Sequence, residues 1–212
     1  MVLCPGSRSG PLALAAAGLM RAGLITLSTA IDERSAGFHA LGRSSASGVA
    51  TAVITTSGTA VANLLPAAVE ADRSSQPLLL ISADRPLRLK NKGANQTVNQ
   101  EAFLAPVCRW CGSGPLDGLN AGPDHELRAL AENAWRHLHQ QPGPVHLNLP
   151  FEEPLHPDLD QQNAFWSQWN RSEPEVNTPN PELWKPTSHS AAPALDPDQA
   201  GVIVAGPWRG LS

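Results

Sequence analysis

Short apolar runs alternate with longer stretches of helical periodicity over the first 150 residues of the chain. The runs span residues 2–4, 24–28, 50–55, 78–82 and 145–149. Two of them contain consecutive aliphatic residues, as strands that are buried on both faces do. Strands that alternate with helices in this way form parallel sheets. The pattern therefore predicts an α/β fold of three layers, a parallel sheet with helices on both faces.

Two of the stretches between the runs have a clear helical pattern. Residues 58–72 are predicted to form one helix, and residues 124–140 form the most regular amphipathic pattern of the chain. The second helix contains His125, His137 and His139, which we expect on its solvated side.

The chain changes character after residue 151. Residues 152–200 contain eight prolines and lose the apolar periodicity, which is typical of a linker. Residues 201–206 then read Gly-Val-Ile-Val-Ala-Gly, like the first strand and glycine turn of another α/β domain. We expect a first domain over 1–151, a Pro-rich linker over 152–200 and the first strand of a truncated second domain over 201–212.

The composition is that of a globular protein, with 42% hydrophobic and 16% charged residues. A formal net charge of -4 and the lack of a Lys/Arg cluster argue against nucleic acid as a partner. No apolar run approaches the roughly 20 residues that cross a bilayer, and the first residues do not form a secretory signal. The sequence therefore predicts a cytoplasmic protein that is not inserted in a membrane.

The three cysteines, Cys4, Cys108 and Cys111, are too few for a disulfide framework. Cys108 and Cys111 have the spacing of a redox motif, although structural thiols are the simpler interpretation. A zinc site would need two further ligands nearby, and the dispersed histidines provide no such pair. His146 alternates with Leu147 in a predicted strand, so we expect it to be a hydrogen-bonded residue of a polar face.

The loops that follow the first and fourth runs contain cations. Ligands of open parallel sheets bind beyond the carboxyl ends of the strands, where such loops meet. Residues 5–10 read Pro-Gly-Ser-Arg-Ser-Gly before a helix, which suits an anion, although an ordinary capped turn has similar residues. Residues 82–86 read Ser-Ala-Asp-Arg-Pro and precede Lys90 and Lys92. These cations suit carboxylates, and a solvated loop is the alternative.

The second and third runs also lead into polar residues. Asp32 is expected to be the N-cap of the next helix. Glu33 either complements the dipole of that helix or is a carboxyl group in an apolar pocket, where desolvation keeps a proton available. The residues alone leave both interpretations open. Residues 55–60, Thr-Thr-Ser-Gly-Thr-Ala, match neither a nucleophile elbow nor a Walker loop, which argues against a serine hydrolase.

Four segments in one order carry a family resemblance: CPGSRSGPLALAAAG, IDERSAGFHALG, TTSGTAVANLLPAAVEADRSSQPLLLISADRP and KGANQTVNQ. Together with GPVHLNLPF at 143–151, they resemble the 2-succinyl-5-enolpyruvyl-6-hydroxy-3-cyclohexene-1-carboxylate synthases, which are thiamine-diphosphate enzymes. The resemblance is dense from residue 2 to about residue 100. It implies the thiamine-diphosphate-binding fold, with residues 1–151 as the pyrimidine-binding domain.

The resemblance also implies a reaction and a set of site residues. The reaction is decarboxylation of 2-oxoglutarate and addition of the resulting succinyl-semialdehyde carbanion to isochorismate, in menaquinone or phylloquinone biosynthesis. Glu33 matches the catalytic glutamate, which hydrogen-bonds the cofactor's pyrimidine ring and promotes ionisation of the thiazolium carbon. The other matching positions are Pro5, Ser57, Gly58 and Thr59 for the cofactor, and Ser7, Arg8, Arg85, Asn95 and Gln96 for the substrates.

In this family one subunit holds the pyrimidine, and a partner subunit holds the diphosphate and its Mg²⁺ or Mn²⁺, so the resemblance implies a homo-oligomer, a dimer or a tetramer. The chain departs from the family by lacking the helix before CPGSRS and the Gly-Asp-Gly segment that holds the metal. Leu116-Asp117-Gly118 is no substitute. We therefore expect a fragment, truncated at both ends, that does not catalyse alone. An acetolactate-synthase-type enzyme and a non-catalytic remnant are the alternatives; Arg8 and the 94–96 segment favour the first interpretation.

Overall fold

The structure is a computed structural model that describes residues 1–156 and 158–169. The chain divides into two compact units, and the described residues up to Asp158 belong to the first. The second unit begins at Leu159, and its described part is the helix α7 (Leu159–Trp169). Within α7, the rings of Phe165, Trp166 and Trp169 pack on one another.

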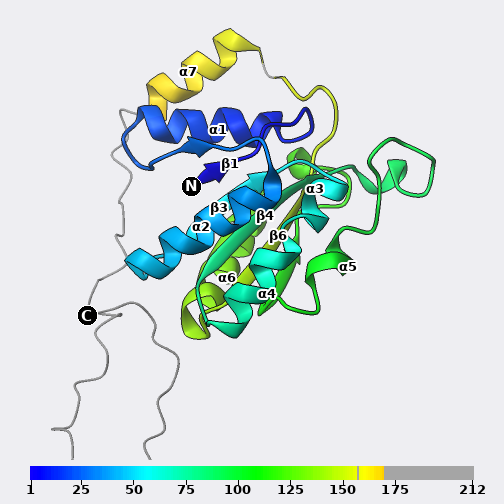
Figure 1. Ribbon diagram of the computed structural model, residues 1–212. Coiled ribbons are helices and arrows are strands. Elements are labelled where there is room, and N and C mark those ends of the chain that lie inside the picture. The colour runs from blue at the N-terminus through cyan, green and yellow to red at the C-terminus, as the bar shows by residue number, and fades with distance from the viewer. Residues whose placement is uncertain (157, 170–212) are drawn as a thin grey trace, which may run out of the picture. The chain divides into compact units, whose positions relative to one another are not determined.

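The first unit contains a six-stranded sheet in which every neighbouring pair of strands is parallel. The strands lie in the order β2-β1-β3-β4-β6-β5 (Figure 1). Their bounds are β1 (Val2–Leu3), β2 (Ser28–Thr29), β3 (Thr51–Thr55), β4 (Leu78–Asp84), β5 (Trp110–Ser113) and β6 (Pro144–Pro150). Because all strands run the same way, the loops after β1, β2, β3 and β4 meet at one edge of the sheet.

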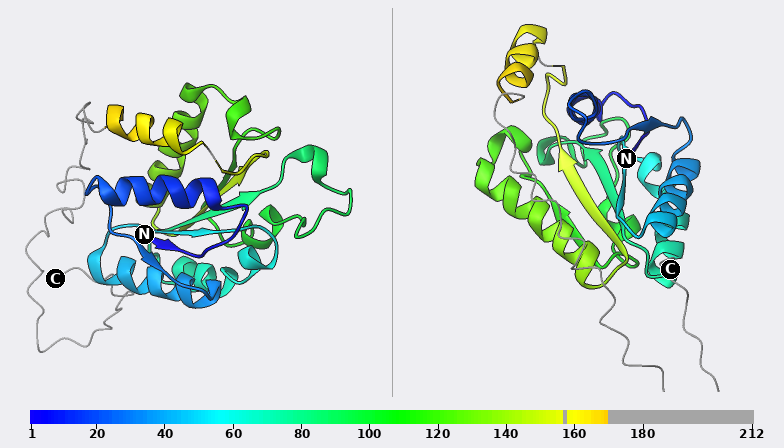
Figure 2. Two further views of the ribbon diagram at one scale, coloured as in Figure 1. Left: turned by 90° about the horizontal axis from the view of Figure 1, so that it is seen from above. Right: turned by 90° about the vertical axis from the view of Figure 1, so that its left-hand side faces the viewer.

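Helices cover both faces of this sheet, as Figure 2 shows from two sides. One face packs against α1 (Gly10–Arg21) and α6 (Asp124–Gln140) through two clusters that share Leu12 and Ile81. The other face packs against α2, α4 and α5, with Val53, Leu78 and Leu80 at its centre. The bounds of these helices are α2 (Glu33–Ser47), α3 (Thr59–Ala62), α4 (Leu65–Arg73) and α5 (Glu101–Leu104). The predicted α/β fold with a three-layer parallel sheet is confirmed.

Helix α2 begins as the sequence predicted. Asp32 has an extended backbone, and its carboxylate accepts a hydrogen bond from the backbone N–H of Ser35 at 2.7 Å. This bond satisfies one of the donors that a helix start leaves unpaired. The helix ends at Gly48, whose positive φ of 68° provides a left-handed C-cap. These two ends place Glu33 in the first turn of α2, beside the carboxyl ends of the strands.

The single helix predicted over 58–72 is wrong. The structure has the short helix α3 and the longer α4, which are separated at Asn63 and Leu64. Pro66 lies in the first turn of α4, where its missing N–H is harmless, but it cannot continue a helix that starts earlier. Leu64 is fully buried at this break and anchors it in the core. The helical spacing of the apolar residues therefore continues across the break between α3 and α4 and does not show it.

Strand lengths also differ from the prediction at both edges of the sheet. Of the run at 24–28, only Ser28 belongs to β2, whose second residue is Thr29. The edge strand β5 was not predicted, because its residues Trp110–Ser113 contain no aliphatic run. Helix α7 lies within the range predicted as linker, and the strand predicted over 201–212 lies outside the described residues. Within the part of the chain that the structure describes, no helix has the length and apolar character to cross a membrane.

Two of the three histidines of α6 are not solvated as predicted, because His139 is half-buried as well as His137. His137 is half-buried, and its ring stacks on Trp110 of β5, with ring centroids 5.4 Å apart and planes within 10°. His125 is exposed. The missed strand explains the error at His137, because β5 places the Trp110 ring against α6.

Candidate functional site

The turn after β1 and the end of β3 are in direct contact. A Cβ atom on Gly6 would lie only 2.5 Å from the Cβ atom of Thr56, so a side chain at this position has no room. The backbone of the turn can therefore approach β3 only because residue 6 is glycine. This contact brings the Ser7-Arg8 turn beside the Ser57-Gly58 bend, as the parallel sheet predicted.

The loop after β4 joins the same group. One guanidinium nitrogen of Arg85, Nη1, donates to Ser57 Oγ at 2.5 Å and to the backbone carbonyl of Gln96 at 3.2 Å. Ser57 is fully buried, whereas Gln96 is exposed and has a positive φ of 56°. Arg85 therefore connects β3, β4 and the 93–97 segment, and the predicted binding residues Ser57, Arg85 and Gln96 do lie together.

Gly58 forms the bend itself. Its φ of 83° favours glycine, and a Cβ atom there would lie 3.2 Å from the Cβ atom of Gln96. The backbone N–H of Gly58 donates to the side-chain carbonyl of Gln100 at 3.0 Å. The buried side-chain amide of Gln100 thus fixes the bend, and Gln96 lies close to it.

Glu33 is half-buried rather than fully solvated. Its carboxylate accepts a hydrogen bond from Asn63 Nδ2 at 3.2 Å. Asn63 ends α3, the short helix that begins directly after Gly58, so Glu33 contacts the element that the bend starts. One carboxylate oxygen has a neutral donor, and no cation within the described residues forms a salt bridge with this side chain.

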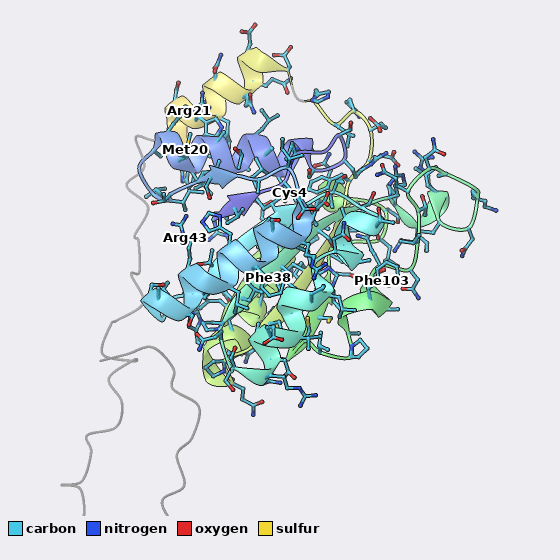
Figure 3. All side chains as sticks on the ribbon, viewed as in Figure 1. Cys4, Met20, Arg21, Phe38, Arg43 and Phe103 are labelled. Atoms are coloured by element: carbon cyan, nitrogen blue, oxygen red, sulfur yellow. The ribbon has the colours of Figure 1, made fainter. Side chains whose placement is uncertain are left out.

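The surroundings of Cys4, the residue after β1, show where Glu33 lies relative to the first strand. Burial, followed by the negative charges of Glu33 and Asp32, raises the pKa of the Cys4 thiol to about 11. Both carboxylates are therefore close to the end of β1. Figure 3 labels Cys4 in this region and Phe38 on α2, the helix that begins at Glu33.

Arg8 points into the protein. Its guanidinium donates to the carbonyl of Phe151 at 2.9 Å and forms a salt bridge of 3.1 Å with Glu153, and its side chain is only 11% exposed. The Nε atom is buried and has no partner among the residues that the structure describes. Burial and the positive charge of Arg8 lower the pKa of Arg85. Two arginines thus share a partly desolvated region, which favours an anion.

The remaining predicted site residues surround this region without specific side-chain contacts. Pro5, Ser7, Thr59 and Asn95 are all exposed, and their side chains form no hydrogen bond or ion pair within the described residues. Their positions agree with a surface that faces a ligand or a partner chain, and their individual roles stay predictions.

Lys90 does not have the role that the sequence suggested. Its ammonium group lies 2.7 Å from Asp84 Oδ2 and 2.9 Å from Glu101 Oε1, and it is only 17% exposed. Because two carboxylates already neutralise it, it is not available to a substrate carboxylate. Lys92 is exposed on the loop. Of Arg85, Lys90 and Lys92, Arg85 is the one with a side-chain contact to the Ser57-Gly58 bend among the described residues.

A buried polar cluster beneath the site was missed by the sequence analysis. The amide nitrogen of Gln100 donates to Asn148 Oδ1 at 2.6 Å, to the Ala83 carbonyl at 3.0 Å and to Ser82 Oγ at 3.2 Å. Ser82 Oγ also lies 2.8 Å from His146 Nε2. His146 thus belongs to a polar face, as predicted, although its Nδ1 atom has no partner in the described part of the chain. Alternation in 145–149 signalled this face, whereas nothing in the sequence signalled Gln100.

No metal centre is found in the described residues. Within 1–156 and 158–169, His, Cys, Asp and Glu side chains form no group of three or more that could hold an ion. The prediction that the metal ligands lie in another domain is not tested by this chain.

Comparison with known proteins agrees with the geometry. Residues 1–103 match the family "Thiamine pyrophosphate enzyme, N-terminal TPP binding domain". Over all 212 residues, the chain is 91% identical to the 2-succinyl-5-enolpyruvyl-6-hydroxy-3-cyclohexene-1-carboxylate synthase of Synechococcus sp. strain CC9311. Proteins of the same name are 63% identical in Parasynechococcus marenigrum strain WH8102 and 59% identical in Prochlorococcus marinus strain MIT 9303.

The match covers this chain completely but only part of each relative. It spans 37% of the Synechococcus protein and 38% of each of the other two. The match nevertheless covers every loop of the candidate site, and the residues matched to the family domain include Glu33, Gly58 and both arginines. The chain therefore belongs to the thiamine pyrophosphate enzyme family and carries its N-terminal TPP binding domain.

Proposed function

We propose that the chain is the pyrimidine-binding part of a thiamine-diphosphate enzyme that decarboxylates 2-oxoglutarate and adds the resulting carbanion to isochorismate. The product would be 2-succinyl-5-enolpyruvyl-6-hydroxy-3-cyclohexene-1-carboxylate, an intermediate of menaquinone or phylloquinone biosynthesis. The names of the relatives support this reaction. The observation that carries the proposal is the position of Glu33, half-buried beside the helix that starts at the Gly58 bend.

Glu33 is suited to exchange a proton with a heterocycle. Its carboxylate has one neutral hydrogen-bond donor, Asn63, and no paired cation among the described residues, so it keeps the capacity to bind a ring nitrogen. We assign it the role of holding the aminopyrimidine of thiamine diphosphate and activating the cofactor. When bound, the cofactor supplies the carbanion chemistry that joins the two substrates. Loss of an acid–base group of this kind slows turnover about 100- to 10,000-fold.

The bend and the arginines fit the same ligands. Gly58 forms a tight bend that favours glycine, and its conformation is supported by Gln100. Arg8 has a buried Nε atom without a partner, and its present partner Glu153 is 58% exposed and therefore displaceable. Both proposed substrates carry carboxylates. Removing Arg8 or Arg85 from such a contact would cost on the order of 2–5 kcal/mol of binding free energy.

The rest of the proposed enzyme lies outside this chain. We propose that a second subunit holds the diphosphate and the Mg²⁺ or Mn²⁺, so that the working form is a homo-oligomer, a dimer or a tetramer, in the cytoplasm. The catalytic centre would then be completed at the exposed surface that carries Ser7, Thr59 and Asn95. On this account the chain alone does not turn over substrate.

A chimera tests this function. This chain would replace the matching residues of the Synechococcus sp. strain CC9311 relative, and product formation would be measured with thiamine diphosphate and Mg²⁺. We expect 2-oxoglutarate to be consumed with isochorismate as acceptor. Consumption of pyruvate without isochorismate would instead indicate an acetolactate-synthase-type enzyme. An inactive chimera beside an active parent would favour a non-catalytic remnant.

A further inference from the structure

Cys108 and Cys111 lie outside the site described above, at the edge of the sheet. Cys108 follows α5, and its backbone N–H donates to the carbonyl of Leu104 at 3.0 Å. Cys111 belongs to β5, the last strand of the sheet, and is exposed, whereas Cys108 is half-buried. One thiol is thus open to solvent, and the other is partly enclosed three residues earlier.

The two thiols are on the same face of the sheet. Cys111 pairs in register with His146, and His146 pairs with Leu80 of β4, so these three side chains project to one side. Leu80 belongs to the core cluster between the sheet and α4, and Cys108 packs against that same cluster. Register and packing therefore bring both sulfur atoms to one side of β5, close enough for each thiol to shift the pKa of the other.

The surroundings make the pair asymmetric. The hydrogen bond from Cys108 lowers the pKa of Cys111, and the neighbouring imidazole of His146 acts in the same direction. The same contact, followed by burial, raises the pKa of Cys108. His146 is fully buried, and its Nδ1 atom has no hydrogen-bond partner among the described residues. An exposed thiolate beside a protected thiol is the arrangement that thiol–disulfide exchange requires.

We propose that Cys108 and Cys111 form a reversible disulfide through exchange with an external disulfide, either a small one such as oxidised glutathione or that of a dithiol protein. The thiolate of Cys111 attacks one sulfur of the external disulfide, forms a mixed disulfide and releases one external thiolate. This thiolate takes the proton of Cys108, and the sulfur of Cys108 then attacks the sulfur of Cys111 and releases the second external thiolate, which takes a proton from water. Two protein thiols are oxidised, and one external disulfide is reduced to two thiols.

This site is independent of the proposed function. It uses none of the residues assigned to the cofactor or the substrates, and it predicts a covalent state of the chain itself. The disulfide would connect β5 to the turn after α5, the helix whose first residue, Glu101, binds Lys90. Its expected effect is local, because the ring that it closes is short.

The test uses the folded chain in buffers with a range of ratios of reduced to oxidised glutathione. After alkylation of free thiols, trypsin should cut after Arg109, between the two cysteines. In the oxidised chain we expect two peptides that stay linked until a reductant is added, and an intact mass lower by two hydrogen atoms. Free Cys108 and Cys111 in fully oxidised glutathione would overturn the proposal, as would a link that involves Cys4.

Two variants assign the roles, and one is the control. Cys108→Ser should accumulate a glutathione adduct on Cys111, because the second thiol is missing. Cys111→Ser should remain unmodified, since Cys108 is half-buried and this burial still raises the pKa of its thiol when Cys111 is absent. Cys4→Ala should behave as the unmodified chain does. Far-ultraviolet circular dichroism checks that each variant folds, and adduct formation on Cys108 in folded Cys111→Ser at the unmodified rate would refute the assignment.

Discussion

Replacement of Gln100 by alanine is expected to destabilise the first unit strongly. The side chain is fully buried and makes four hydrogen bonds, one from the Gly58 N–H and three to Ser82, Ala83 and Asn148. Alanine leaves the Gly58 N–H buried without its partner, which costs about 1–3 kcal/mol. The loss of buried side-chain atoms adds about 1–2 kcal/mol. Together these predict a decrease of about 2–5 kcal/mol in the free energy of unfolding.

Urea unfolding followed by tryptophan fluorescence measures this decrease. Gln140→Ala is the matched control, because Gln140 is exposed in the last turn of α6, and we expect a change within about 0.5 kcal/mol there. Gln100→Glu gives a second reading. Glutamate keeps an acceptor for the Gly58 N–H, but its carboxylate faces Asn148 Oδ1 as an anion. The free energy of unfolding of this variant, relative to the unmodified chain, should therefore rise as the pH falls, because the protonated carboxyl group can donate a hydrogen bond. If Gln100→Ala unfolds as Gln140→Ala does, the buried cluster does not fix the bend.

Three further predictions concern other parts of the first unit. Lys90→Met should lower the free energy of unfolding by about 3–5 kcal/mol, because it leaves the buried Asp84 without its cation, whereas the exposed Lys92→Met should have little effect in the same urea assay. Gly58→Ala should lower the melting temperature, because alanine at a φ of 83° and against Gln96 costs about 1–3 kcal/mol of strain. The control Gly42→Ala, whose new side chain would enter open space on α2, should be neutral or stabilising. Burial and the nearby charges of Glu33 and Asp32 raise the pKa of Cys4 from 9.0 to about 11, so folding favours the protonated thiol. The free energy of unfolding should be unaffected by this group below pH 9 and fall by up to about 3 kcal/mol as the pH rises towards 11, and Cys4→Ala should remove that part of the fall.

The sequence predicted the parts of the fold that have a strong periodic signal. Continuous aliphatic residues located β3 and β4 to within about two residues, because buried parallel strands need such residues on both faces. Alternation of apolar and polar residues located β6 equally well. Strand β5 has no such signal, since it is an edge strand of Trp110, Cys111, Gly112 and Ser113. The interruption between α3 and α4 was hidden for a related reason, because Leu64 keeps the apolar spacing while Pro66 starts a new helix.

The sequence predicted which loops form the candidate site, but not which side chains contact one another there. Parallel topology alone indicated that the loops after β1 to β4 meet at one edge, and the contacts of Gly6 with Thr56 and of Arg85 with Ser57 follow that expectation. The sequence could not show that Lys90 is neutralised by two carboxylates or that Gln100 supports the bend. Both depend on side chains that come from distant strands and that meet only when the sheet has formed.

The central claim is that the Glu33 carboxylate activates thiamine diphosphate, and exchange of the cofactor's thiazolium C2 proton with deuterium measures this most directly. The experiment needs no substrate, and it would use the chimera with the Synechococcus relative, loaded with cofactor and Mg²⁺. Glu33→Gln should slow the exchange at least about 100-fold, while Glu70→Gln, an exposed glutamate on α4, should leave it unchanged. Equal exchange rates in folded, cofactor-bound Glu33→Gln and the unmodified chimera would contradict the account.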